Sequence, residues 1–148
     1  MSIKQVLSWI SVLLWMSLIF YLSHQPATES SELSAGVMQL LLTSFEAIIP
    51  FIQIETEWFH FLIRKGAHFT AYFILGILLI NALRASGLSG GKSAVVAFLL
   101  SVLYAISDEV HQLFIPGRSG EVGDVLIDSA GAAVGILVVL LCRKKRLV

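Results

Sequence analysis

The sequence predicts an all-α integral membrane protein with four transmembrane helices, both termini in the cytoplasm, and an interfacial amphipathic helix in the first outer loop. Hydrophobic residues make up 57% of the 148 residues and charged residues only 14%, against about 25% charged residues in soluble domains. Apolar residues gather in four long stretches, and acidic and basic residues are separated along the chain. This composition argues against soluble, nucleic-acid-binding and redox roles, and the length suits one domain over residues 1–148.

The four predicted spans cover about residues 5–23, 62–84, 93–113 and 122–142. A helix needs about 20 residues to cross the hydrocarbon core, and lipid offers the backbone no hydrogen bonds, so each span must be helical. The first stretch could be mistaken for a signal peptide, because the basic residue Lys4 precedes an apolar run. However, residues 21–26 contain no small-x-small cleavage site. We therefore expect it to be retained as a helix.

The long outer loop between the first two spans carries a helical pattern of its own. Residues 28–34 are rich in capping residues, and apolar residues then recur at helical spacing until Pro50. We expect a helix over about 31–49 that lies on or dips into the outer interface. Aromatic residues at the start of the second span, Trp58, Phe59 and Phe61, mark re-entry into the membrane.

The distribution of charge predicts the orientation. One side of the four-span arrangement carries seven basic residues and no acidic one: Lys4, Arg84, Lys92 and residues 143–146. The other side carries Arg64, Lys65 and Arg118 with all ten acidic residues. The positive-inside rule places the first side in the cytoplasm.

The single cysteine, Cys142, excludes a disulfide framework.

Helix lengths place ionisable residues inside the outer third of three spans. About 20 residues counted from Ala94 reach Leu113, so that span includes the polar residues from 108 to 112. The residues concerned are Arg64, Lys65 and His68 in the second span, Asp108, Glu109, His111 and Gln112 in the third, and Asp124 and Asp128 in the fourth. Such groups cost a few kcal/mol each unless they are paired or wetted, and they usually face the bundle interior.

Helical spacing supports a shared inward face. The stripes are Lys65, His68, Tyr72 and Gly76; then Ser101, Tyr104, Asp108 and His111; and finally Asp124, Asp128, Gly131 and Gly135. Gly131 and Gly135 form a small-xxx-small surface that allows another helix to approach closely. We therefore expect a packed bundle directly beneath the acidic residues.

The chemistry of these side chains leaves several roles open. Arg64, Lys65 and His68 could bind a phosphate or carboxylate, or could pair with the acidic residues and hold the bundle together. The candidates for general acid/base groups are Asp108, Glu109, His111 and His68, which could instead form a structural polar network. Together with Asp128 they are also residue types that bind divalent metals. No tight signature such as H-E-x-x-H is present, so we assign no metal ligand and no cofactor.

Further ligand-binding candidates are Tyr72, Gln112, Arg118, Asp124 and Asp128, with His24 and Gln25 at the end of the first span. Arg118 follows a Pro-Gly turn, where it could cap the C-terminal carbonyls of the third span or reach over the site to an anionic ligand. The alternative for His24 and Gln25 is a structural role, in which they form hydrogen bonds at the membrane interface without binding a ligand.

Several stretches resemble the VanZ-like family, named for a teicoplanin-resistance accessory protein. They are residues 23–26 (SHQP), 65–72 (KGAHFTAY) and 107–120 (SDEVHQLFIPGRSG), followed by Asp124, Asp128, Gly131 and Gly135. The resemblance covers nearly the whole chain, and 107–120 is its most specific block. His24 stands where relatives often have Ser, and Asp128 where they often have Asn. The resemblance implies a multi-pass bacterial envelope protein and, for the namesake, lowered susceptibility to teicoplanin-type glycopeptides.

These observations favour a membrane protein that recognises or modifies an anionic lipid-linked envelope component at an outward-facing polar site. Its partners would be membrane lipids or lipid-linked cell-wall precursors, and a homo-oligomer or a membrane partner protein is compatible with the sequence. One alternative is a non-catalytic binding or assembly factor that masks cell-wall precursors or organises partners. Another is a small proton-coupled transporter, although the inner halves of the spans offer few polar residues.

Overall fold

The computed structural model describes residues 2–46 and 56–144, which form helices and short connections without a strand. The helices are α1 (Ile3–Ser23), α2 (Ala27–Glu46), α3 (Thr56–Ala85), α4 (Gly90–Gln112) and α5 (Val122–Lys144). Four segments are long and apolar enough to cross a membrane: Ile3–Ser23, Phe61–Ala85, Gly90–Gln112 and Val122–Arg143. The predicted all-helical membrane fold with four spans is confirmed.

The additional helix α2 begins earlier than predicted, at Ala27 rather than near residue 31. The carbonyl of Pro26 accepts the first helical bond, from the amide of Ser30 at 3.0 Å. The expected capping residues lie inside the helix, where the Ser31 hydroxyl donates to the Thr28 carbonyl and the Ser34 hydroxyl to the Ser30 carbonyl. Serine can bond to its own helix as readily as it can cap one. The predicted end near residue 49 lies outside the described residues.

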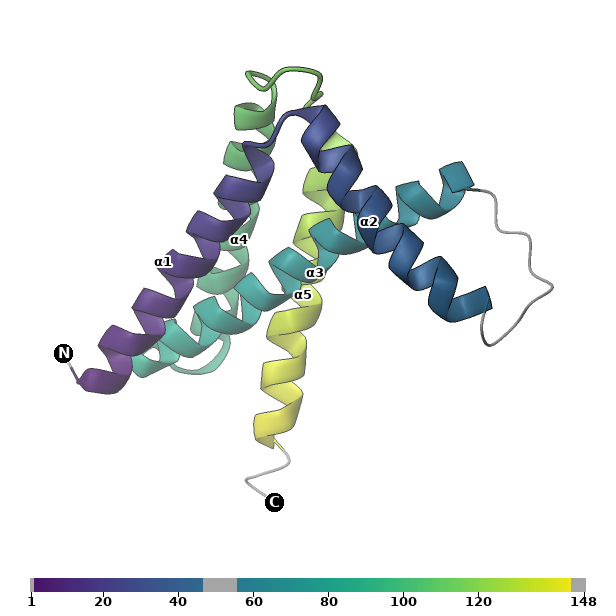
Figure 1. Cartoon of the computed structure of the whole chain (residues 1–148). Helices are drawn as coiled ribbons and strands as arrows, with labels where there is room; N and C mark the ends of the chain where they lie inside the picture. The colour runs from purple at the N-terminus through teal and green to yellow at the C-terminus, as the bar shows by residue number, and fades with distance from the viewer. Residues whose placement is uncertain (1, 47–55, 145–148) are drawn as a thin grey trace.

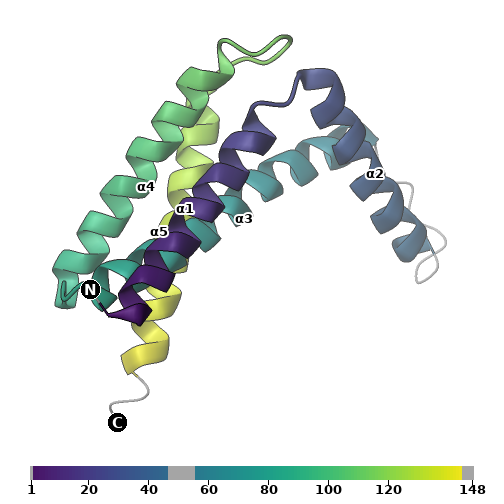
Figure 2. The same ribbon diagram turned by 60° about the vertical axis from the view of Figure 1, so that its left-hand side comes forward.

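The helices α1, α3, α4 and α5 form the bundle, and α2 turns back from the end of α1 and runs away from it across α3 (Figure 1). The rotated view shows α2 leaning away from α1, α4 and α5 (Figure 2). We call the end of the bundle where α1 and α4 finish and α3 and α5 begin the polar end. The start of α1 and the end of α5 lie at the opposite end (Figure 1).

Glycines bring α3 and α5 into close contact, as the small-xxx-small pattern predicted. A Cβ at Gly131 or Gly135 would collide with the carbonyl oxygens of Phe69 and Phe73, and one at Gly76 would lie 2.5 Å from the Ala132 carbonyl oxygen. Side-chain hydrogen bonds to backbone carbonyls fix α1 against its neighbours: Trp15 donates to Ala71 (2.8 Å) and Tyr104 to Met16 (2.6 Å).

Large apolar side chains on α1, α4 and α5 point outward rather than into the core. Leu13, Leu103, Leu126 and Leu137 are all more than half exposed, an arrangement that would be unstable in water over so large an area but suits a lipid environment. The residues packed between the helices combine large side chains such as Tyr72 and Leu75 with the fully buried Ala97, Ala105 and Ala132. The apolar outer surface of the bundle is therefore the surface that would contact the lipid chains of a bilayer.

Candidate functional site

The polar end gathers buried polar side chains from four helices, as the helical spacing predicted. The buried polar residues there are Ser23 on α1, Lys65 on α3, Asp108, Glu109 and Gln112 on α4, and Asp124 and Asp128 on α5. His68 and the fully buried Tyr72 on α3 join them. The residues of α1, α4 and α5 lie within two turns of a helix end, whereas Lys65, His68 and Tyr72 lie further inside α3, which begins at Thr56.

Lys65 is occupied by two carboxylates rather than directed at open space. Its ammonium donates to Glu121 at 2.8 Å and makes a closer contact with Asp124. The hydrogen bond from Lys65 lowers the pKa of the Glu121 carboxyl below its ordinary value. The guanidinium of Arg64 lies 3.7 Å from Glu121, and its side chain is about half exposed. Of the two predicted anion-binding cations on α3, Arg64 is the one that stays accessible.

Gln112 connects the two neighbouring acids of α4. Its amide donates to Glu109 at 3.3 Å and, more weakly, to Asp108 at 3.5 Å. The second oxygen of Glu109 accepts from the backbone amide of Glu121 at 2.8 Å. The other oxygen of Asp108 and the hydroxyl of Ser23 are buried without a hydrogen-bond partner in the described part of the chain. Asp108 is therefore the less satisfied of the two acids.

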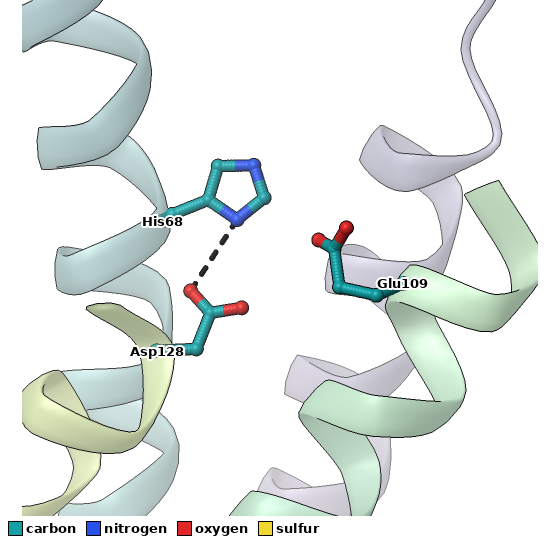
Figure 3. A group of neighbouring side chains, drawn as sticks. All are labelled: His68, Glu109 and Asp128. Atoms are coloured by element: carbon teal, nitrogen blue, oxygen red, sulfur yellow. Dashed lines mark ion pairs between the residues drawn. The ribbon is translucent and has the colours of Figure 1, made fainter. Parts of the chain in front are cut away.

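His68, Glu109 and Asp128 converge from α3, α4 and α5 (Figure 3). The His68 Nδ1 atom lies 3.3 Å from Asp128 Oδ1, and one ligating atom from each of the three residues lies within 4.8 Å of the others. Asp128 is completely buried. The sequence placed all three residues in a larger set that could bind a divalent metal, but it did not single out these three from Asp108 and His111.

Arg118 caps a different helix from the one that the sequence suggested. It donates to the Ser23 carbonyl at 2.8 Å and to the Leu22 carbonyl at 3.5 Å, both at the end of α1, and its other nitrogen contacts the Ser30 hydroxyl at 3.2 Å. Thus it joins α1 to α2 instead of closing α4. Burial lowers the pKa of its guanidinium, but arginine remains protonated in proteins.

His24 and His111 lie together, apart from the buried acids. Their rings are stacked, with His24 Nδ1 3.1 Å from His111 Nε2, and Phe20 packs against both. The predicted grouping of His111 with Asp108 and Glu109 as acid/base residues is therefore not what the geometry brings together. His111 turns toward α1, whereas His68 turns toward the acids.

Two cavities lie beside this cluster. The first, about 440 Å³, is lined mostly by polar residues, among them Arg64, His68, Arg118, Glu121 and Asp124. The second, about 460 Å³, is lined mainly by apolar groups of α1, α2 and α3, with Gln25, Tyr72 and Asp108 also on its wall. They share six lining residues: Ser30, Ser34, Arg64, His68, Gln112 and Arg118. The two cavities are therefore neighbours that share part of their walls.

Three residues of the site were not singled out from the sequence. Ser23 and Ser30 lie on the walls of the cavities, and Glu121 shares Lys65 with Asp124. Ser23 begins the SHQP stretch and Glu121 directly follows the 107–120 block, so both adjoin motifs that were noticed. Ser30 carries no sequence signal, because its role depends on where α2 packs.

The family model described as VanZ/LLP1 matches residues 8–143, which is nearly the whole chain. No curated protein and no solved structure matches the chain.

Proposed function

The chain belongs to the VanZ/LLP1 family, and we propose that this multi-pass membrane protein recognises an anionic, lipid-linked component of the cell envelope at its polar end, on the extracytoplasmic side. The observation that carries the proposal is the junction of a polar cavity with an apolar one. A lipid with a charged headgroup needs both kinds of space, one beside the other.

The headgroup would be held mainly by Arg64, with help from those N–H groups of Arg118 that are not used in its bonds to α1 and α2. Among the residues that the structure describes, Arg64 has only a long contact to Glu121, and its side chain is about half exposed. Both Arg64 and Arg118 line both cavities. Arginine suits phosphate and carboxylate because its planar fork can donate two parallel hydrogen bonds. The two acids on the polar wall, Glu121 and Asp124, are already paired with Lys65, which reduces their repulsion of an anion.

The hydrocarbon chain would lie in the apolar cavity between α1, α2 and α3. Ile19, Leu22, Leu33, Ala67 and Ala71 form much of its wall. Leu22 and Leu33, from α1 and α2, are 43% and 61% exposed, so the cavity is bordered by side chains that also meet the surrounding lipid. A lipid could enter sideways between these two helices without leaving the bilayer.

Chemistry on the bound headgroup would fall to His68 and Asp108. Both line the apolar cavity, and one oxygen of Asp108 is buried without a partner among the described residues. A side chain can transfer a proton only when it reaches the reacting atom, and neither Glu109 nor His111 borders either of these two cavities. If the protein only binds its ligand, the same two arginines are needed but Asp108 is dispensable.

The distribution of buried polar groups favours a site at one end over a path across the bilayer. Among the described residues, the buried polar side chains outside the polar end are Ser93 and Ser101. A proton or ion pathway normally carries ionisable residues along its length. Binding at one leaflet therefore accounts for the arrangement better than transport does.

The test is lipid binding to the purified full chain in nanodiscs. The probes are a long-chain polyprenyl phosphate, phosphatidylglycerol, phosphatidylcholine and inorganic phosphate, each followed by native mass spectrometry and titration. We expect the two anionic lipids to bind more tightly than phosphatidylcholine or free phosphate. Arg64→Gln should weaken binding about 10- to 100-fold, the loss of one charge-assisted hydrogen bond.

Matched variants separate the two cavities from the rest of the protein. Arg84→Gln removes an arginine at the opposite end and should leave binding unchanged. Ala67→Phe fills the apolar cavity, whereas Thr70→Phe adds the same ring to an exposed position of α3 that borders neither cavity. Equal binding by Arg64→Gln and Arg84→Gln, or by the two phenylalanine variants, would contradict the proposal.

A cellular assay links this site to the family's association with teicoplanin. Expression in a susceptible bacterium should raise the teicoplanin concentration needed to stop growth, and Arg64→Gln should abolish the increase at equal protein levels in the membrane. Asp108→Asn in the same assay distinguishes modification from binding: loss of protection with retained lipid affinity indicates catalysis, and full protection indicates a binding role.

A further inference from the structure

His68, Glu109 and Asp128 have a geometry that neither lipid binding nor helix packing explains. They extend from three different helices toward a common point (Figure 3), and one nitrogen or oxygen of each lies within 4.8 Å of the others. Glu109 and Asp128 border neither cavity, so an anionic headgroup would not meet them directly. Asp128 in particular has only the ion-pair contact with His68 among the described residues.

The carboxylate of Asp128 is the most telling group. It has no exposed surface, and neither of its oxygens accepts a hydrogen bond from any described residue. His68 Nδ1 lies 3.3 Å away and forms an ion pair with Asp128 when the imidazole is protonated. A buried, ionised carboxylate without donors is strongly unfavourable. A cation bound between Asp128 and His68 would accept one lone pair from a carboxylate oxygen and one from the imidazole nitrogen.

The charges of the polar end are also unbalanced. Five carboxylates gather there, Asp108, Glu109, Glu121, Asp124 and Asp128, beside three permanent cations, Arg64, Lys65 and Arg118. Lys65 is engaged by Glu121 and Asp124, and Arg118 by backbone carbonyls of α1. Neither is therefore directed at Asp128 or Glu109. With all five carboxylates ionised and His68 neutral, the surplus among these described residues is two negative charges, which equals the charge of one divalent cation.

We propose that His68, Glu109 and Asp128 bind a divalent transition-metal ion, with Zn²⁺ and Mn²⁺ as the best-suited candidates. One imidazole with two carboxylates favours these ions over Ca²⁺ and Mg²⁺, which prefer oxygen ligands alone. Bonds of about 2.0–2.2 Å set neighbouring ligand atoms roughly 3 Å apart, close to the 3.3 Å between His68 and Asp128. Glu109 retains free lone pairs after its contacts with Gln112 and Glu121.

The surrounding contacts support the three ligands in the way that metal sites require. Gln112 and the backbone amide of Glu121 hold the Glu109 carboxylate in place. Such outer contacts orient metal ligands and commonly change metal affinity by about 10- to 100-fold when removed. His68 also lines both cavities, so the ion would lie beside the space proposed for the headgroup. The metal site is nevertheless testable without any lipid.

The experiment measures metal binding to the detergent-purified full chain. After chelator treatment and dialysis, titration with Zn²⁺ and Mn²⁺ should give one equivalent bound, with Mg²⁺ and Ca²⁺ at least tenfold weaker. Asp128→Asn and Glu109→Gln should each weaken binding by about 10- to 100-fold or more. Glu32→Gln, at an exposed carboxylate of α2, serves as the matched control and should leave binding unchanged.

A single-histidine variant separates this site from the His24–His111 pair, which could collect a metal ion at the surface. The chain has four histidines, and replacing three of them by Asn leaves only His68. Pulsed electron paramagnetic resonance of Mn²⁺ bound to this variant should detect coupling to one imidazole nitrogen. The proposal is overturned if the wild type binds no equivalent, if binding survives Asp128→Asn and Glu109→Gln, or if the nitrogen coupling is absent. Because the spectrum needs no acidic variant, the result does not depend on whether those variants fold.

Discussion

Lys65 is a cation held almost entirely inside the polar end, with its side chain 11% exposed. Its two carboxylate partners differ in burial, since the Asp124 side chain is 7% exposed and that of Glu121 is 41% exposed. A buried ion pair contributes little net stability compared with apolar packing, but loss of one partner leaves an uncompensated charge. At the scale of the residue, Lys65 therefore serves the fold more than it serves a ligand.

We expect Lys65→Met to destabilise the protein by about 3–5 kcal/mol, the cost of leaving a buried charge unpaired. Addition of Asp124→Asn to this variant should recover a large part of the loss, because it removes the stranded charge while keeping the shape. Reversible unfolding in mixed micelles with increasing denaturing detergent measures both values. Wild-type stability of Lys65→Met would show that the pair does not hold the bundle together.

At the scale of the element, the contact between α3 and α5 depends on the absence of side chains. Gly131 and Gly135 face backbone carbonyls of α3, and Gly76 faces the Ala132 carbonyl of α5. Small residues let two helix backbones approach each other in a membrane, where there is no hydrophobic force between helices to drive association. This contact sets the separation of His68 and Asp128, which lie about two turns or less from these glycines.

Gly76→Ala should therefore destabilise the protein by about 1–3 kcal/mol, the cost of overpacking a tight interface. Gly66 lies on the same helix with nothing within 4 Å of the position of a Cβ. Gly66→Ala should be neutral or stabilise by up to about 1 kcal/mol through helix propensity. Detergent unfolding of the pair checks the difference, and equal stabilities would mean that the close approach is unimportant.

At the scale of the whole molecule, the two ends differ in charge and in chemistry. Arg84 and Arg143 lie at the end opposite the acids, where they donate to Ser93 and Asn81 at 3.2 and 3.1 Å. The start of α1 and the end of α5 share that end (Figure 1). An even number of spans places both ends of the chain on the same side of the membrane, whichever way the protein is inserted. The positive-inside rule, not the packing, predicts the side.

We expect the polar end to face outward. In a Cys142→Ser background, a cysteine at Ser119, in the exposed loop of the polar end, should react with an impermeant maleimide in intact cells. A cysteine at Ser89, exposed at the opposite end, should react only after the membrane is permeabilised. Reversed labelling would place the site in the cytoplasm and exclude an extracytoplasmic ligand.

The amino-acid sequence by itself determined the four spans and the helix faces that carry most of the polar residues. These features follow from apolar length and helical periodicity, which are properties of one segment at a time. His68, Asp108 and Asp128 were placed on inward faces for that reason, and Gly131 and Gly135 were identified as a packing surface without knowledge of their partner.

Only the tertiary structure decided which polar groups meet. Lys65 takes Asp124 and Glu121, Arg118 caps α1 rather than α4, and His111 stacks on His24 instead of joining the acids. Each pairing depends on the rotation and separation of helices that are distant in sequence, and the cavities depend on where α2 leans. Local patterns predict that a buried charge needs a partner. Which partner it finds is decided by the packing of the helices, because packing sets the distances between groups on different helices.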